Sequence, residues 1–268
     1  MNLLITRINR ANQQLVAVLL SLFLGLNLFF YSVLAHAEIA IIIDDVGYNQ
    51  RDFELLTLPA EVTLSVLPHT PFSKKIAEQA YRRGQEIMLH LPMESISGRV
   101  LEPGTIEANM DKAEILNTLD SALAEFPYAT GVNNHMGSRL TQLYEPMNVI
   151  MQALKMRNLY FVDSRTTSHS IALEVAQKQG VTAYRRHVFL DNVLDEQAIR
   201  KQLDLVLKLA EKKQTVIAIG HPHPQTIAAL HAFFAENSAK NIELTKVSSL
   251  EPASSRYAKL NSNDYKAD

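Results

Sequence analysis

The sequence predicts an α/β fold built on a parallel sheet, either doubly wound or closed into a barrel. Short apolar runs alternate with longer amphipathic stretches from residue 39 to about residue 247. Strand–helix alternation over such a length is typical of parallel sheets. The first run, residues 39–43, is apolar at every position, as a strand must be when both faces of its sheet are covered.

Seven segments carry the strand pattern and six carry helical spacing. The predicted strands are residues 39–43, 62–67, 86–90, 130–134, 159–162, 215–219 and 242–245. The predicted helices are residues 72–83, 112–126, 146–157, 171–179, 196–212 and 224–237. Residues 91–110 contain Pro92, Gly98, Pro103 and Gly104, which predicts a long loop over one end of the sheet.

Residues 1–37 have the pattern of a secretory signal peptide. Arg7 and Arg10 are the only charges before Glu38, residues 15–34 are almost all apolar, and residues 35–37 (Ala-His-Ala) place small side chains where signal peptidase reads them. We predict cleavage after residue 37.

The alternative for the same segment is an uncleaved membrane anchor, because about 20 apolar residues are long enough to span a bilayer. Either way the two arginines hold the N-terminus in the cytoplasm. We therefore expect a periplasmic domain over residues 38–250, followed by a flexible polar tail over residues 251–268. The chain would touch the membrane only through an uncleaved N-terminal segment.

Composition limits the partners and the chemistry. The formal net charge is −2, and the N-terminal segment contributes two arginines and no acid, so the predicted domain is more negative still. A nucleic-acid partner would call for a basic face, so none is expected. The chain has no cysteine, so a bound metal would have to be held by His, Asp or Glu.

Polar residues gather directly after five of the predicted strands. They are Asp44 and Asp45, His90 with Glu94, Asn133 to His135, Asp163 to Arg165, and His221 with His223. The carboxyl ends of parallel strands converge on one crevice, so these side chains should meet in space although they are far apart in the sequence. Packing alone does not explain five such strand ends.

Each residue also has a structural interpretation. An Asp after a strand often caps the next helix, and a single His90 could be a hydrogen-bonded core histidine. Two adjacent buried carboxylates repel, however, and persist only where a cation or a proton relieves them. For Asp163 and Ser164 we favour a loop network that orients neighbouring groups over direct catalysis.

These residues fit metal-assisted hydrolysis of an amide or ester. A divalent ion bound by Asp45, His90 and one further side chain would keep positions open for water and substrate. Asp44 could then accept a proton from water, and His221 could protonate the leaving group. Ser/His/Asp catalysis fits less well, because no serine stands on a Gly-x-Ser-x-Gly turn.

The motifs resemble those of the polysaccharide deacetylases of the NodB-homology type, and more closely their divergent bacterial branch. Residues 43–47 (Ile-Asp-Asp-Val-Gly) resemble the first motif, residues 80–87 followed by His90 the approach to the second, and residues 218–221 (Ala-Ile-Gly-His) the last. Residues 134–141 and 163–167 look like marks of the divergent branch. The resemblance implies an irregular (β/α) barrel of about seven parallel strands and removal of acetyl groups from an N-acetylated sugar polymer.

It also implies roles for individual residues. Asp44 corresponds to the base, Asp45 and His90 to metal ligands, and His221 to the catalytic acid. The second motif of the family is His-x-x-x-His, and here Glu94 stands in place of the second histidine. The third ligand is therefore Glu94 or His135. The metal is expected to be zinc, with cobalt or manganese as alternatives.

Four further residues are expected at the substrate. They are Arg139, Asp163, Arg165 and His223, the two arginines as groups that bind substrate oxygens or support a developing oxyanion. The Arg-Pro-Pro loop of the family is absent.

The leading hypothesis is a periplasmic, metal-dependent hydrolase that removes N- or O-acetyl groups from a carbohydrate polymer of the cell envelope. The altered second motif supports an alternative, in which a catalytically weak or inactive relative binds envelope glycan or a protein partner. A hydrolase of another ester or phosphate would use the same site with a different product.

Overall fold

The computed structural model describes residues 38–250 except 99–100, 213–214 and 238–242. The predicted signal peptide (1–37) and the predicted polar tail (251–268) lie outside the described residues. Within the described ranges, none of the helices has the length and hydropathy needed to cross a bilayer.

The described residues form one parallel sheet. Its strands are β1 (Glu38–Val46), β2 (Thr63–Val66), β3 (Ile87–Met93), β4 (Gly131–Met136), β5 (Tyr160–Asp163), β6 (Ala183–Arg185), β7 (Val188–Phe189), β8 (Thr215–Gly220) and β9 (Glu243–Leu244). The hydrogen-bonded order is β6-β5-β4-β3-β2-β1-β8-β7, with β9 paired to β1.

The sheet curls into an incomplete barrel with β6 and β7 as its two edges. These strands share no ladder, yet two residues of chain join them. The Arg186 amide donates to the carbonyl of Asp163 in β5, and the His187 amide donates to the carbonyl of Ile217 in β8. The connection thus brings the two edges together, and the predicted irregular barrel of parallel strands is confirmed.

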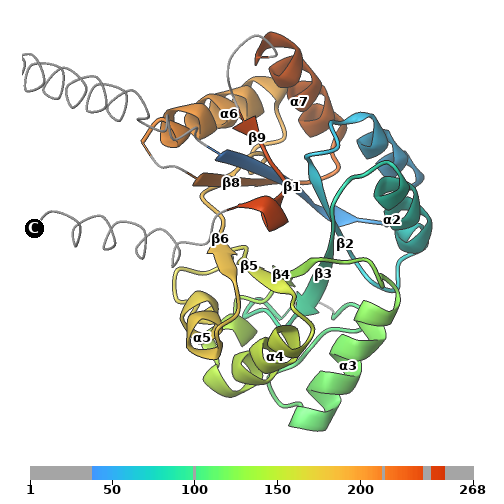
Figure 1. The fold of residues 1–268 in the computed structure, drawn as a ribbon, viewed down its shortest axis with the longest axis vertical. Coiled ribbons are helices and arrows are strands. Elements are labelled where there is room, and N and C mark those ends of the chain that lie inside the picture. Colours follow the sequence, from blue (N-terminus) through green and yellow to red (C-terminus); the bar gives the residue numbers. More distant parts are fainter. Residues whose placement is uncertain (1–37, 99–100, 213–214, 238–242, 251–268) are drawn as a thin grey trace, which may run out of the picture. The chain divides into compact units, whose positions relative to one another are not determined.

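Helices lie around the outside of the strands (Figure 1). They are α2 (Ser73–Arg82), α3 (Lys112–Ala124), α4 (Tyr144–Met156), α5 (Ala172–Gln179), α6 (Glu196–Ala210) and α7 (Pro224–Asn237). Local chemistry sets several ends. Asp111 and Glu114 form a capping box at the start of α3, Asp195 caps α6, and Gly180 ends α5 in the left-handed conformation.

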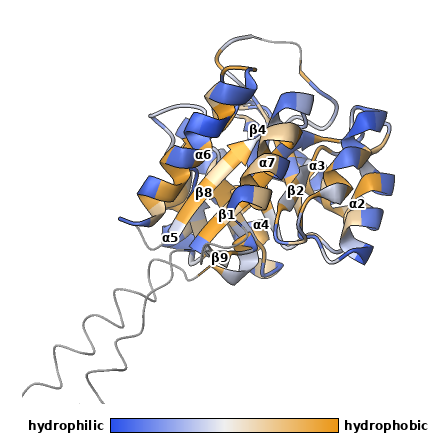
Figure 2. Ribbon diagram, turned by 90° about the horizontal axis from the view of Figure 1, so that it is seen from above, coloured by the Kyte–Doolittle hydropathy of each residue, from blue (hydrophilic) through white to orange (hydrophobic). Residues whose placement is uncertain are grey.

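Both faces of the strands are buried, as the unbroken apolar run at residue 39 predicted. Ile39, Ile41 and Ile43 pack into the outer core beneath the helices. The alternate residues Ala40 and Ile42 belong to a smaller cluster inside the barrel. Figure 2 shows the resulting pattern, with apolar strands between helices that turn their polar sides outward.

The sequence prediction missed two short strands and the 3-10 helices. Strands β6 and β7 have three and two residues, which is too little chain for an alternating pattern to show. The 3-10 helix η1 (Gln50–Thr57) was also not predicted. All seven predicted strands and all six predicted helices are present, with ends displaced by a few residues.

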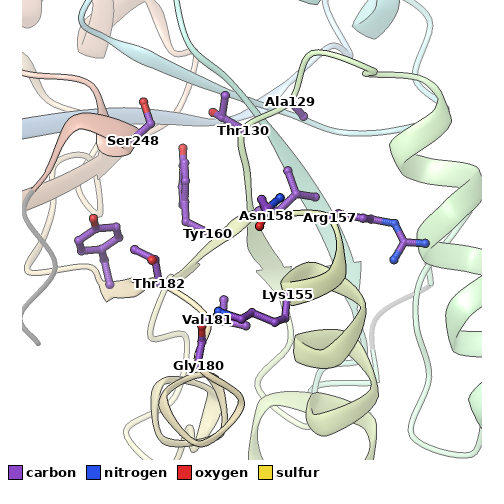
Figure 3. Close-up of a pocket in the computed structure, with 12 residues that line it drawn as sticks. Ala129, Thr130, Lys155, Arg157, Asn158, Tyr160, Gly180, Val181, Thr182 and Ser248 are labelled. Carbon is purple, nitrogen blue, oxygen red and sulfur yellow. Dashed lines mark hydrogen bonds between the residues drawn. The ribbon is translucent and has the colours of Figure 1, made fainter.

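A cavity of about 490 Å³ lies at the amino ends of β4, β5 and β6, where Thr130, Tyr160 and Thr182 are among its lining residues (Figure 3). Beside it, the buried Glu86 carboxylate accepts hydrogen bonds from the hydroxyls of Thr130 and Tyr160 and from the amide of Ser248. All of its hydrogen-bonding capacity is used by protein groups, so Glu86 links several segments at the amino ends of the strands. The predicted functional residues lie at the opposite ends of the strands.

Candidate metal centre

A bulge at the end of β1 turns two adjacent carboxylates toward the same site. In a regular strand, neighbouring side chains point to opposite faces. Here the pairing with β2 shifts between Ile43 and Val46, and Asp45 adopts a φ of 58°. Asp44 and Asp45 both approach His90 as a result, with oxygen–nitrogen distances of 3.8 and 3.0 Å. Backbone strain of this kind is typical of functional sites.

The turn after β1 holds this conformation. Gly47 has a φ of 127°, and a Cβ atom there would lie 2.4 Å from Thr70 Oγ1, so only glycine fits. The buried Asp52 carboxylate accepts hydrogen bonds from the amides of Gly47 and Asn49. The Ile-Asp-Asp-Val-Gly segment is therefore shaped locally to present the two aspartates.

Three side chains from three strands converge into one cluster. Asp45 Oδ1 lies 3.0 Å from His90 Nε2 and 2.8 Å from His135 Nδ1, and the two ring nitrogens are 3.1 Å apart. The strands are β1, β3 and β4. The sequence prediction that these strand ends meet is thus correct in its geometry.

Asn133 organises the groups behind the cluster. Its Oδ1 accepts from His90 Nδ1 and from the Ser65 hydroxyl, each at 2.7 Å, and its Nδ2 donates to Asp44 Oδ1 at 2.7 Å. When His90 carries its proton on Nδ1, its Nε2 lone pair faces Asp45 and His135. A metal-binding histidine usually donates a hydrogen bond of this kind from the ring nitrogen that does not face the metal, and this bond fixes its tautomer and ring orientation.

His135 is supported by the long loop after β3. Its Nε2 lies 3.3 Å from Glu102 Oε1, close enough for an ion pair but not aligned as a hydrogen bond. Burial and Glu102 raise the pKa of the neighbouring Tyr48 to about 12. The loop therefore adds a carboxylate to the outer side of the cluster.

The charges of the cluster depend on one another. Burial alone would raise the pKa of Asp45, but the bonds and charges of His135 and His90 hold it well below its usual range. Burial alone would lower the pKa of His90, whereas Asp44 and Asp45 raise it. Without a bound cation, protons on the histidines thus hold these side chains together. A metal ion that binds there would displace these protons.

The donor set fits a divalent metal ion. One carboxylate oxygen and two imidazole nitrogens are ligands that zinc takes in catalytic sites, where a further position stays open. Tetrahedral zinc with bonds of about 2.0–2.1 Å separates its ligand atoms by about 3.3 Å. The observed separations of 2.8–3.1 Å need to open by only a few tenths of an ångström.

A second cluster faces the first across the barrel mouth. Asp191 Oδ1 accepts from His221 Nδ1 at 2.8 Å, and Asp191 Oδ2 accepts from the His221 amide and from the Thr226 hydroxyl at 2.6 and 2.7 Å. His221 Nε2 lies 3.9 Å from Asp45 Oδ2. Burial alone would lower the pKa of His221, but Asp191 raises it to about 9. His221 is therefore a cationic proton donor at neutral pH.

His221 also stacks on an aromatic ring that in turn contacts a guanidinium group. The Phe189 ring stacks on it with centroids 6.0 Å apart, and Arg186 lies 3.6 Å from the centroid of the Phe189 ring. Arg186 also donates from Nε to the Ser164 carbonyl and from Nη2 to the Arg165 carbonyl. This arginine links the loop after β5 to the stack that holds His221.

The structure does not bring Glu94 into the cluster, contrary to one of the two predictions for the third ligand. Its Oε1 pairs with Arg139 Nη1 and its Oε2 accepts from the Ala108 amide, both at 2.6 Å. The chain turns away at Met93, where β3 ends, so the residue four positions after His90 points into the loop. Arg139 is tied to Glu94 on the rim, and its side chain is 57% exposed.

Of the other residues expected at the substrate, Asp163 is placed differently. It is fully buried, and its two oxygens accept from the Arg165 amide and the Ser170 hydroxyl. It therefore orders its own loop, as the structural interpretation expected, and cannot reach a substrate. Arg165 adopts a φ of 51° on that loop, and the His223 ring lies 6.0 Å from that of His221.

Three residues of the site had no role in the sequence prediction. Asn133 was noted only as part of a polar strand end. Asp191 and Arg186 were missed, because each follows a strand of two or three residues that carried no recognisable pattern. The available signal for Asp191 was an acid directly after the three apolar residues 188–190.

The fold and the site define a parallel α/β barrel with a His/Asp cluster at the carboxyl ends of its strands. Residues 41–250 match the family described as divergent polysaccharide deacetylase. Over 214 residues the chain is 40% identical to the uncharacterized protein YibQ of Escherichia coli, which covers 80% of this chain and 67% of that protein. The chain belongs to the divergent polysaccharide deacetylase family.

Solved structures show the same fold. The uncharacterized protein ATU2773 from Agrobacterium tumefaciens has a TM-score of 0.78 and 25% identity, covering 82% of this chain and 92% of that one. The catalytic domain of a peptidoglycan N-acetylglucosamine deacetylase from Eubacterium rectale has a TM-score of 0.50 and 12% identity, covering 81% and 91%. The second likeness concerns the fold alone.

Proposed function

We propose that the protein is a periplasmic, metal-dependent hydrolase that removes N- or O-acetyl groups from a cell-envelope glycan. The observation that carries the proposal is the convergence of Asp45, His90 and His135 beside the buried Asp44, with the Asp191–His221 pair opposite. Family membership supports a carbohydrate substrate. The apolar N-terminal segment supports export to the periplasm.

Asp45, His90 and His135 would hold the metal, which we propose to be zinc, with cobalt or manganese as alternatives. The chemistry that a divalent ion held by these residues would supply is polarisation of an acetyl carbonyl and acidification of water. Asn133 keeps the Nε2 lone pair of His90 directed toward the site.

Asp44 and His221 would divide the proton transfers between them. Asp44 Oδ1 is held by Asn133, and no hydrogen-bond partner of Oδ2 occurs among the described residues, so this oxygen could accept the proton of the attacking water. His221, protonated and held by Asp191, would donate a proton from Nε2 to the departing amine or alcohol.

A release assay over a panel of substrates tests the proposal. The metal-loaded protein is incubated with N-acetylated and O-acetylated glycans, a simple acetyl ester and a phosphate monoester, and acetate and phosphate are quantified. We expect the acetylated glycans to release acetate, and we expect a chelator to abolish this release. Phosphate release would point to another hydrolase, and binding without any product would favour the catalytically weak relative.

The Asp191→Asn protein is expected to lose activity at alkaline pH. A catalytic acid works only below its pKa, so the alkaline limb of kcat/KM should lie near pH 9 in the wild type. Without the charge of Asp191, the pKa of His221 falls, and the limb should move down by about 1–3 pH units. The measurement is the pH profile of acetate release.

Thr226→Val is the matched control, because it removes a hydrogen bond to Asp191 Oδ2 but leaves the carboxylate charge. Its alkaline limb should stay near that of the wild type. An Asp191→Asn protein with reduced turnover but an unmoved alkaline limb would show that Asp191 supports structure only.

A further inference from the structure

A second cavity, of about 500 Å³, has three arginines among its lining residues. It collects Arg165 from the loop after β5, Arg185 from the end of β6, and Arg186 and His187 from the connection between β6 and β7. Thr167 and Ser168 also line it. We call it the arginine pocket. Three arginines from two segments of chain therefore line one space at the seam of the barrel, where Arg165 and Arg186 also donate to backbone carbonyls.

The positive charge of the arginine pocket is not neutralised locally. Among the described residues, no carboxylate forms an ion pair with Arg165, Arg185 or Arg186. The acid nearest to Arg165 in sequence, Asp163, is buried, and both its oxygens are taken by its own loop. Burial lowers the pKa of Arg186, opposed by the more distant charges of Asp163 and Asp44. A partly desolvated cationic group favours an anionic ligand.

The arginine pocket is next to the candidate catalytic site. Arg186 lies 3.6 Å from the centroid of the Phe189 ring, and the same ring stacks on that of His221 with centroids 6.0 Å apart. One aromatic ring thus contacts both an arginine of the pocket and the proposed proton donor. A glycan bound with an acetyl group at His221 would therefore have the arginine pocket beside it.

We propose that the arginine pocket binds an anionic group of the glycan, a carboxylate or a phosphate, and so selects acetylated glycans that carry negative charge. The proposal rests on the proposed function for its substrate class. Guanidinium groups bind both kinds of oxyanion in the same forked geometry, so the experiment has to separate the two sources.

Binding measurements on the full chain carrying Asp44→Asn test the proposal without turnover. The probes are a neutral chitin tetrasaccharide and a hyaluronan tetrasaccharide, which carries carboxylates, and N-acetylglucosamine with and without a 6-phosphate. At low salt the dissociation constant of a charged probe should be about tenfold lower than that of its neutral counterpart. A gain for one charged probe identifies the source of the anion as carboxylate or phosphate, and a gain for both shows that either is accepted.

Adding Arg185→Ala should raise the dissociation constant of the favoured charged probe about tenfold and leave that of its neutral counterpart unchanged. Arg165→Ala should act in the same direction. Arg82→Ala is the matched control, since Arg82 is exposed on α2 and pairs with Glu78, and it should change neither value.

Equal affinity for charged and neutral probes, no binding of any charged probe, or no effect of the two arginine variants would overturn the proposal. The outcome is independent of acetate release. Charge-selective binding by a protein that releases no acetate would remove the proposed function and retain the arginine pocket as an anion site. Acetate release without charge-selective binding would retain the proposed function and remove the arginine pocket as an anion site.

Discussion

The Asp45→Ala/His90→Ala protein is expected to release acetate at less than about a thousandth of the wild-type rate. The pair supplies two of the three atoms that converge in the cluster. Without them no catalytic metal should bind, and the several kcal/mol of transition-state stabilisation that a metal supplies are lost. The measurement is the initial rate of acetate release in the presence of added zinc.

His231→Ala is the matched control for this loss. His231 bonds with Thr57 at an exposed position on α7, so its removal should leave the rate unchanged. A double variant that retained a tenth or more of the wild-type rate with added zinc would show that the cluster is not the catalytic centre.

The Asp44→Asn protein is expected to keep its metal and to lose about 10²- to 10⁴-fold in kcat, the range for removal of a general base. The substitution preserves the oxygen that accepts from Asn133 Nδ2, so the local structure should hold. An amide cannot take the proton of an attacking water. The measurement is kcat together with metal content on the same preparation.

The two readouts separate the roles of the neighbouring aspartates. Loss of metal in Asp44→Asn would make Asp44 a ligand instead of a base. Turnover within a few-fold of wild type, with metal retained, would mean that another group takes the proton.

Much of the fold could be predicted because the pattern is repeated and long. A run that is apolar at every position, such as residues 39–43 of β1, must be covered on both faces, and the six α-helices carried clear spacing. Strands β6 and β7 could not be found in this way, since pairing with β5 and β8 makes them strands and their composition does not.

The meeting of Asp45, His90, His135 and His221 could be predicted, because the direction of parallel strands sends their carboxyl ends to one rim. The bulge that turns Asp44 and Asp45 to one side could not, since it depends on pairing with β2.

The choice between Glu94 and His135 as third ligand also needed the structure. A spacing of four residues brings two side chains together on a helix, but His90 lies in a strand that ends at Met93. His135 is brought in from the neighbouring strand, in register with Pro92. Spacing along the chain carries no such information.

Metal analysis of the purified protein shows whether Asp45, His90 and His135 hold a metal. The protein purified without chelator should contain about one zinc, cobalt or manganese ion per chain. Asp45→Ala/His90→Ala should contain none, and Glu94→Ala should keep its metal because Glu94 is bonded to Arg139 and Ala108. Absence of metal from the wild type after supplementation, or loss of metal in Glu94→Ala but not in the double variant, would show that these three residues do not form the metal site.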